Sequence, residues 1–549
     1  MFLRVLACAA VCLGTTTAVT EPVAARPEVV RSELAQEGDG LRFESHAVYR
    51  LDPAAGAVHV TLDMTLTNEQ PDQSGPGYIR QSFLPRIGIP TLAEATNITA
   101  SRDDGFALDV SQDATGSPYV STVVIDVSPD LYYRDTQTVH LAYDLPGQAP
   151  RSTGITRVNP AFVSIVAFAM GDPGLATVDV VVPEPFEAEF SGAELARTNG
   201  DGEATFSATE ILDPDGWNVG VVARNDDALV PRRLSVGSRE ILLEAWPGDE
   251  EWATFVETTL QDGLPVMEDL IGQPWPRQRP LRVTETASPY IYGYAGWYSS
   301  LDHAIEIGDE LDPVVVMHEL SHVWFNARLF SDRWVNEAFA EEYASRTLDR
   351  IGQPPGAPEA IDDGDPGRVA LNAWSTPSLL DDISAEQERY GYNASWSVLR
   401  AVTDEISIER LSEVIAAADE DLIAYHGDPA AADWRGEDDW RRLLDLLEEV
   451  GGSTTAAGLF GAYVVTEDEA AALAERAAAR EALAALHAQG AGWSPPLGVR
   501  QALADWDFAA AHERMAVAAG VLAQRDEVAA TVAPVGLGVA PSFERAYEG

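Results

Sequence analysis

The sequence has only two cysteines, Cys8 and Cys12, and both lie within its first twelve residues. A chain that loses this segment keeps no thiol, so disulfides and a cysteine nucleophile are excluded from the mature protein. Lipid attachment at Cys12 is not expected, because the preceding Ala10 and Val11 fit a bacterial lipoprotein site poorly.

The segment that holds both cysteines has the features of an export signal. A basic start at Arg4 precedes an apolar core from Val5 to Leu13 and a stretch of small and polar residues from Gly14 to Thr20. We therefore predict a signal peptide over residues 1–26, a linker over residues 27–40, and an exported protein that is extracytoplasmic or secreted. The apolar core is too short to span a membrane.

Basic residues are scarce, and lysine is absent altogether. The chain has 36 basic against 88 acidic residues, which gives a formal net charge of −52. A surface of this charge repels phosphate backbones and anionic lipid headgroups, so nucleic acid is not an expected partner. No later stretch is long and apolar enough for a transmembrane helix, so no integral membrane span is expected.

The first part of the chain has the alternating pattern of β-strands. Apolar residues alternate with polar ones from Val58 to Leu66 and again from Val139 to Tyr143, which is typical of a sheet with one buried face. We predict an all-β, sandwich-like domain over residues 41–232.

The pattern then becomes mixed and finally helical. Strands over 241–246 and 281–286 enclose a helix opened by Asp249, which predicts an α+β domain over residues 233–465. An Ala-rich helix that ends near Gly490 predicts a C-terminal helical region over residues 466–549. The predicted fold class is therefore multidomain α+β.

The most informative motif begins at His318 and ends at His322, with the sequence His-Glu-Leu-Ser-His. Helical residues four positions apart leave the same face, so both imidazoles can hold one metal ion. Glu319 lies about 100° further round the helix, where it can contact a water at the metal as a general base. Asp312 can cap this helix and Pro313 suits its first position.

A catalytic zinc needs a third protein ligand and keeps one position open for water, whose pKa it lowers to about 7. A second helical pattern follows from Trp334 to Arg350. Glu337 on this helix could approach the histidine pair, and Glu341, one turn later, is the alternative. We expect one zinc ion per chain.

Two further segments extend the pattern. The residues from Trp334 to Phe339 read Trp-Val-Asn-Glu-Ala-Phe, and those from Tyr392 to Arg400 read Tyr-Asn-Ala-Ser-Trp-Ser-Val-Leu-Arg. With the His-Glu-x-x-His motif they resemble the aminopeptidase N family of gluzincin zinc metallopeptidases. That family has a Trp-x-Asn-Glu-Gly-Phe-like segment after its zinc helix and a catalytic tyrosine in a Tyr-x-Lys-Gly-x-x-Val-Leu-Arg-like run.

The resemblance implies a thermolysin-like catalytic domain with zinc ligands His318, His322 and Glu337. It also implies that Glu319 is the general base and that Tyr392 stabilises the oxyanion, with Tyr390 as the alternative tyrosine. Fourteen residues separate His322 from Glu337, whereas the family usually has eighteen, the number that separates His322 from Glu341. The context of Glu337 still favours it, because a shorter surface loop between two helices changes the helices little.

A second departure concerns specificity. The family has a Gly-x-Met-Glu-Asn strand whose Glu binds the free amino terminus, but residues 292–298 contain no carboxylate. A buried ammonium group without its charged partner loses a few kcal/mol, so strict aminopeptidase specificity is not expected. Gly293 and Gly296 allow an extended peptide to approach the strand, and Tyr294 and Trp297 could wall its subsites. An aromatic core strand is the alternative interpretation.

The sequence thus predicts an exported zinc metallopeptidase that acts on peptides or proteins through a zinc-activated water. Two other hypotheses remain: a non-catalytic peptide-binding protein on a peptidase scaffold, and an epoxide or ester hydrolase that uses the same metal centre. The sequence leaves open the oligomeric state and the choice between ends and interiors of peptides.

Overall fold

The computed structural model describes residues 40–75, 78–276, 279–287, 294–375, 385–427 and 434–549. The predicted signal peptide, both cysteines and all but the last residue of the predicted linker lie outside these residues. Gly293, one of the predicted substrate-binding residues, also lies outside them.

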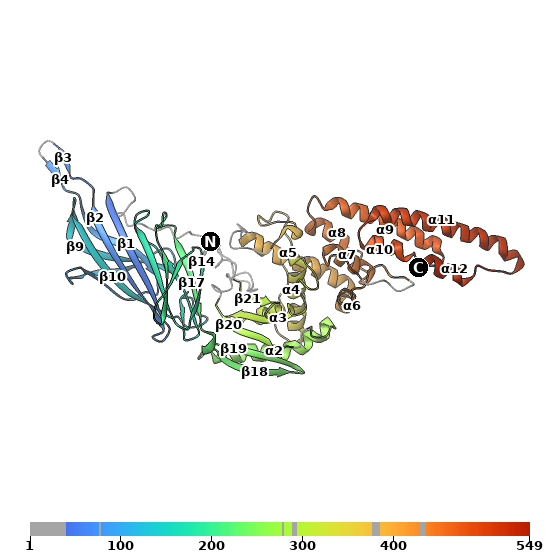
Figure 1. Cartoon of the computed structure of the whole chain (residues 1–549), viewed down its shortest axis with the longest axis horizontal. Helices are drawn as coiled ribbons and strands as arrows, with labels where there is room; N and C mark the ends of the chain where they lie inside the picture. Colours follow the sequence, from blue (N-terminus) through green and yellow to red (C-terminus); the bar gives the residue numbers. More distant parts are fainter. Residues whose placement is uncertain (1–39, 76–77, 277–278, 288–293, 376–384, 428–433) are drawn as a thin grey trace.

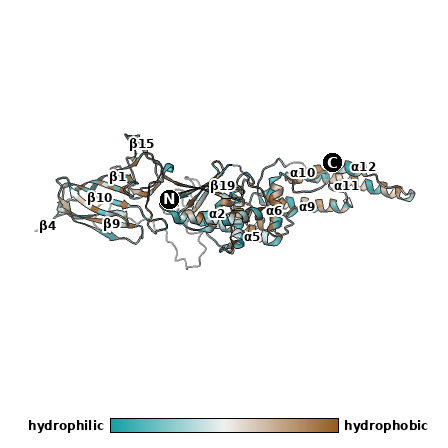
Figure 2. Cartoon of the chain, turned by 90° about the horizontal axis from the view of Figure 1, so that it is seen from below, coloured by the Kyte–Doolittle hydropathy of each residue, from teal (hydrophilic) through white to brown (hydrophobic). Residues whose placement is uncertain are grey.

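The described chain runs from β-sheets through a mixed sheet and helix region to a set of helices (Figure 1). The N-terminal β-sheets and the helices from α9 (Ala470–Gly490) to α12 (Pro541–Glu548) lie at opposite ends of the molecule in both views (Figure 2). The predicted multidomain α+β fold class is confirmed. Within the described residues, no helix combines the length and the apolar character that crossing a bilayer requires.

The N-terminal region contains three large sheets around one core. An eight-stranded sheet has the order β15-β16-β13-β1-β2-β10-β6-β7, a second has the order β11-β12-β17-β14, and a third has β5-β9-β8. Apolar residues from all three sheets form one buried cluster. The alternation seen in the sequence is the cause, since every second residue of β2 from Val58 to Leu66 is buried.

The strands of this region are β1 (Leu41–Asp52), β2 (Ala57–Asn68), β3 (Gln73–Gly75), β4 (Tyr78–Arg80), β5 (Phe83–Leu92), β6 (Thr96–Arg102), β7 (Ala107–Leu108), β8 (Val110–Ala114), β9 (Val120–Tyr132), β10 (Thr136–Pro146), β11 (Arg157–Val158), β12 (Phe162–Phe168), β13 (Ala176–Pro183), β14 (Glu187–Ser191), β15 (Ala196–Asn199), β16 (Glu203–Ala208) and β17 (Asn218–Arg224).

The middle region is built on a five-stranded sheet with the order β18-β19-β20-β22-β21. Strands β19, β20 and β22 are parallel, whereas β21 runs antiparallel to β22 and forms one edge of the sheet. Helix α2 begins after Asp249, whose side chain accepts a hydrogen bond from the Trp252 amide as the sequence predicted for a capping residue. Helices α3 and α4 carry the two candidate ligand motifs.

The elements of this region are β18 (Val230–Val236), β19 (Arg239–Ala245), α2 (Glu250–Ile271), β20 (Leu281–Thr286), β21 (Gly296–Ser299), β22 (Ala304–Gly308), α3 (Pro313–Ser321), α4 (Arg333–Arg350), α5 (Ala385–Ile406), α6 (Ile408–Asp419) and α7 (Trp440–Glu449). The C-terminal helices are α8 (Ala456–Leu459), α9 (Ala470–Gly490), α10 (Leu497–Ala504), α11 (Phe508–Val532) and α12 (Pro541–Glu548).

Buried ion pairs join the β-sheet region to the middle region. The Arg151 guanidinium donates to both oxygens of Asp249 at 2.9 Å, and Arg157 donates to Asp309 at 3.1 Å. Asp249 opens α2 and Asp309 follows β22, so these pairs hold the β-strands against the sheet that carries the candidate site. Removing one partner of such a pair would leave a buried charge uncompensated.

Candidate functional site

Helix α3 begins where the sequence predicts. The Asp312 carboxylate accepts a hydrogen bond from the Val314 amide at 2.8 Å, and Pro313 occupies the first helical position. The helix ends at Ser321, and His322 follows with right-handed helical backbone angles of φ −63° and ψ −11°. The His318 and His322 side chains therefore still project from one face, with ring centroids 4.8 Å apart.

Helix α4 packs beside α3 and brings Glu337 to the histidine pair. The two Nε2 atoms of His318 and His322 are 3.1 Å apart, and the Glu337 Oε2 atom lies 3.2 Å and 3.6 Å from them. Zinc binds nitrogen and oxygen at about 2.0–2.2 Å, so tetrahedral ligands on one ion are roughly 3.3–3.5 Å apart. The three side chains are therefore arranged as one zinc ion requires, and among the described residues no other such group is found.

The second nitrogen of each imidazole is engaged away from this focus. His322 Nδ1 lies 2.8 Å from the Phe325 carbonyl oxygen, and His318 Nδ1 lies 3.4 Å from Glu341 Oε1. With protons on the Nδ1 atoms, the lone pairs of both Nε2 atoms are directed to the shared focus, as metal binding requires. Two imidazole nitrogens and one carboxylate oxygen at this spacing therefore fit a bound zinc ion.

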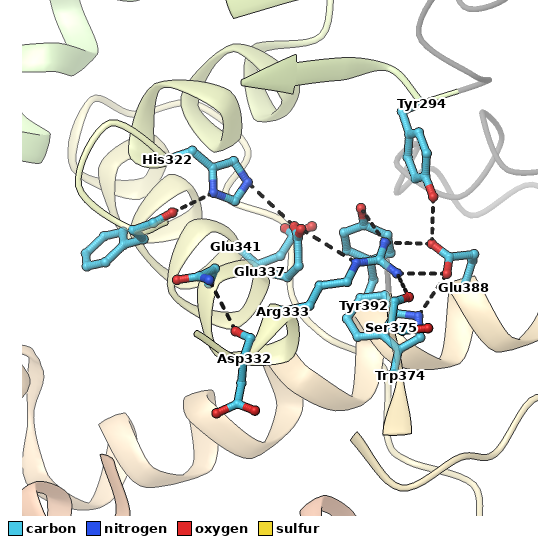
Figure 3. Close-up of polar contacts among 12 residues, drawn as sticks. Tyr294, His322, Asp332, Arg333, Glu337, Glu341, Trp374, Ser375, Glu388 and Tyr392 are labelled. Atoms are coloured by element: carbon cyan, nitrogen blue, oxygen red, sulfur yellow. Dashed lines mark hydrogen bonds and ion pairs between the residues drawn. The ribbon is translucent and has the colours of Figure 1, made fainter. Parts of the chain in front are cut away.

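Glu341, the alternative third ligand in the sequence analysis, therefore does not occupy the position of a ligand. It lies beside His318 Nδ1, on the side away from the shared focus, and the close group contains Glu337 instead. A carboxylate on the second nitrogen of a metal-binding histidine fixes the ring and raises its basicity. In Figure 3 the Glu337 carboxylate lies between His322 and Arg333.

Burial and charge work against each other in this group. Burial raises the pKa of Glu337, but the imidazoles of His322 and His318 hold that pKa well below its usual value. Burial lowers the pKa of His318, and the Glu341 and Glu337 carboxylates more than offset it. The Glu337 side chain is thus kept ionised, the state in which it can bind a metal.

Glu319 lies next to the histidines on α3 and against the edge strand. Its side chain is buried, and burial is the largest cause of a pKa above the usual value for a glutamate. A Cβ atom added to Gly296 of β21 would lie only 2.7 Å from Glu319 Oε1. The absence of a side chain at Gly296 therefore gives Glu319 its room.

Tyr392 lies on α5 near the histidine pair. Its ring centroid is 6.3 Å from that of His318 and 5.1 Å from that of Trp374. Its hydroxyl accepts a hydrogen bond from the Arg333 Nη2 atom at 3.4 Å (Figure 3). The alternative, Tyr390, is buried, and its hydroxyl makes no hydrogen bond to any residue that the structure describes.

The other predicted substrate residues lie on or before β21. The Tyr294 hydroxyl donates to Glu388 Oε2 at 3.0 Å (Figure 3). Trp297 follows Gly296 in the strand, so its side chain points to the opposite face of the sheet, where it is 44% exposed. Their roles in substrate binding remain predictions.

Two residues beside Tyr392 were not foreseen from the sequence. Arg333 and Glu388 make a bidentate pair, with Nη–Oε distances of 2.9 Å and 2.8 Å. Each precedes a predicted site residue by four positions on the same helix, namely Glu337 and Tyr392. That spacing, which places residues on one helix face, is the sequence signal that could have found them.

Comparison with known proteins gives matches only among solved structures: no protein-family model and no curated protein matches the chain. The chain is similar to an M1 zinc metallopeptidase from Deinococcus radiodurans, at 16% identity and a TM-score of 0.28, over 78% of this chain and 95% of that one. A mutant M1 zinc metallopeptidase from the same organism, bound to a Tyr-Ser-Ala substrate, matches at 15% identity and a TM-score of 0.29, over 77% and 94% of the two chains.

Native yeast LTA4 hydrolase matches at 12% identity and a TM-score of 0.32, over 81% of this chain and 72% of that one. The structural similarity is thus to M1 zinc metallopeptidases, and the group of His318, His322 and Glu337 fits the His-Glu-x-x-His and Glu pattern.

Proposed function

We propose that this protein is an exported zinc metallopeptidase that cleaves peptide bonds. The observation that supports it best is the meeting of two imidazole Nε2 atoms and one carboxylate oxygen, with Nε2 to Nε2 at 3.1 Å. His318, His322 and Glu337 would hold the ion. Zinc in such a site supplies Lewis acidity to a carbonyl oxygen and to water.

Glu319 would act on the attacking water. It is buried beside the histidine pair, and its raised pKa brings it closer to neutrality, where a group can both accept and return a proton. It would take a proton from water during attack on the scissile carbonyl and then transfer that proton to the leaving nitrogen. No covalent intermediate with the protein is needed.

Tyr392 would donate its hydroxyl hydrogen to the carbonyl oxygen as negative charge develops there. One such donor contributes roughly 10²–10³-fold to the rate in a water-excluded site. The ring of Tyr392 is half-buried and packs against Trp374, which restricts the orientation of the ring.

The substrate would be an extended peptide along β21, the edge strand whose backbone lies against Glu319. Residues 294–299, the described part of this segment, contain no carboxylate that could bind a substrate amine. The Tyr294 hydroxyl donates to Glu388, and Arg333 already neutralises that carboxylate. We therefore expect peptides with blocked amino termini to be cleaved.

A single experiment separates this function from its competitors. Wild type and Glu319→Gln, both loaded with zinc, are incubated with a peptide library of which half is N-terminally acetylated, and products are identified by mass. We expect one zinc per chain in both proteins and cleavage of free and acetylated peptides by the wild type alone. Zinc binding without any cleavage would indicate a peptide-binding protein, and turnover confined to esters or epoxides would indicate a different hydrolase.

A further inference from the structure

Arg333 is a buried cation one helical turn before Glu337 on α4. Its side chain is only 10% exposed, and its guanidinium carbon lies 3.8 Å from the centre of the Trp374 ring. A charge at this depth needs compensation from hydrogen bonds and an opposite charge. The neighbouring side chains therefore fix the position of the Arg333 guanidinium group.

Four hydrogen bonds and one longer ion-pair contact surround the Arg333 guanidinium. Nη1 donates to Glu388 and to the Ser375 carbonyl, Nη2 donates to Glu388 and to the Tyr392 hydroxyl, and Nε lies 4.0 Å from Glu337 Oε1. Arg333 thus contacts the predicted oxyanion donor and the candidate metal ligand at once.

Glu388 fixes the guanidinium from the other side. Its Oε1 accepts from Arg333 and from the Trp374 indole at 2.9 Å, and its Oε2 accepts from Arg333 and from the Tyr294 hydroxyl at 3.0 Å. Four donors saturate this carboxylate, so it is unsuited to bind a substrate ammonium group. Figure 3 shows Tyr294, Glu388, Arg333 and Tyr392 as one connected group.

We propose that Arg333, held by Glu388, is a positioning residue that orients the Tyr392 hydroxyl toward the substrate carbonyl oxygen. Because Arg333 donates to the phenol oxygen, that oxygen acts as acceptor in this contact and its own hydrogen is free to point elsewhere. A phenol that accepts a charge-assisted hydrogen bond is also a stronger donor through cooperativity. This proposal rests on the proposed peptidase function and adds a residue to it.

Steady-state kinetics on the best-cleaved peptide of the library tests the proposal with Arg333→Met, Arg333→Lys and Glu388→Gln. We expect kcat to fall roughly 10- to 100-fold in Arg333→Met, with a smaller effect on KM, because the contact matters most when the oxyanion forms. Lysine restores the charge and should recover part of the rate. Zinc content of one per chain must be unchanged.

A double-mutant cycle with Tyr392→Phe separates positioning from a general loss of structure. If Arg333 acts through the Tyr392 hydroxyl, adding Arg333→Met to Tyr392→Phe should lower kcat by less than about 3-fold further. Arg350→Met is the matched control, since Arg350 lies on the same helix in an exposed ion pair with Asp269. It should leave kcat unchanged.

A binding measurement gives a readout that does not depend on turnover. We expect Arg333→Met to weaken binding of a phosphinic pseudopeptide, whose tetrahedral P–O group stands in for the oxyanion, at least 10-fold. Binding of the product peptide should change less than about 3-fold.

Full kcat and unchanged pseudopeptide affinity in Arg333→Met would overturn the positioning role alone, provided that the wild type cleaves peptides and requires Glu319. Additive losses in the double mutant would overturn it as well. If Arg333→Met does not fold, Glu388→Gln decides, because it keeps the shape of the carboxylate and weakens only its hold on Arg333. A wild type that cleaves no peptide would overturn both proposals.

Discussion

Gly296 on the edge strand and Glu319 on the helix are in direct contact. A Cβ atom on Gly296 would lie 2.5 Å from Glu319 Cγ, a separation that side chains do not adopt. The backbone along which we expect a peptide to bind and the proposed general base are therefore neighbours with nothing between them. The lack of a side chain at Gly296 therefore determines where the Glu319 side chain can lie.

Gly296→Ala should displace Glu319 and lower kcat while zinc is retained. Its backbone is not in the left-handed region, so alanine is tolerated there and the strain falls on Glu319. A displacement of about 1 Å of a reacting group can cost 10²-fold in rate. Peptide cleavage and zinc content are measured together. Gly458→Ala, where a Cβ would meet nothing within 4 Å, is the matched control, and equal activity of the two variants would contradict the contact.

Glu337 and Glu341 should contribute differently to metal affinity. Glu337→Gln removes a charged ligand and should lower zinc affinity most. Glu341→Gln removes a partner of His318 Nδ1 and should lower zinc affinity about 10- to 100-fold. Competition with a chromophoric chelator gives both dissociation constants. A larger loss in Glu341→Gln than in Glu337→Gln would reverse the assignment.

Much of the site could be read from the sequence because it depends on helical spacing. His318 and His322 lie four residues apart, and the cap formed by Asp312 and Pro313 set the start of α3, which the structure reproduces. Which glutamate faces the histidines could not be read from spacing alone. Glu337 and Glu341 occupy the same face of α4, and only the packing of α4 on α3 distinguishes them.

The rest depends on contacts between segments that are far apart in the sequence. Helical spacing could mark Arg333 and Glu388 one by one, but the two are 55 residues apart, so their pairing has no local signature. Gly296 was expected to allow a peptide to approach, and its close contact with Glu319 requires the register of β21 against β22 to be known. The strands of the N-terminal region, by contrast, follow from the period of two in their apolar residues.

Metal removal should destabilise the middle region. The candidate ligands come from α3 and α4, so an ion that binds only the folded state ties two helices together. At a free zinc concentration of about 1,000 times the dissociation constant, this linkage amounts to roughly 4 kcal/mol. We expect a chelator to lower the Tm of the wild type and added zinc to restore it. The Tm of Glu337→Gln should respond much less, and equal responses would contradict the assignment.

Glu285, which is not one of the candidate metal ligands, should make stability depend on pH. This β20 residue is 2% exposed, and its Oε2 accepts from the Trp246 amide at 2.7 Å. Burial and the nearby Asp249 carboxylate raise its pKa to about 10, although the Trp246 amide opposes the shift. The folded state therefore holds a proton that the unfolded state releases near its ordinary pKa of 4.5.

The sign of the effect follows from proton linkage. The contribution of Glu285 to stability is fully present below about pH 4.5 and is lost as pH rises toward 10, because the folded state binds the extra proton over that interval. Glu285→Gln mimics the protonated carboxyl and keeps an acceptor for the Trp246 amide. Relative to wild type, its Tm should therefore rise between pH 6 and pH 9. The same substitution at the exposed Glu240 measures the effect of removing one negative charge. A Tm difference that does not change with pH would show that Glu285 is ionised in the folded protein.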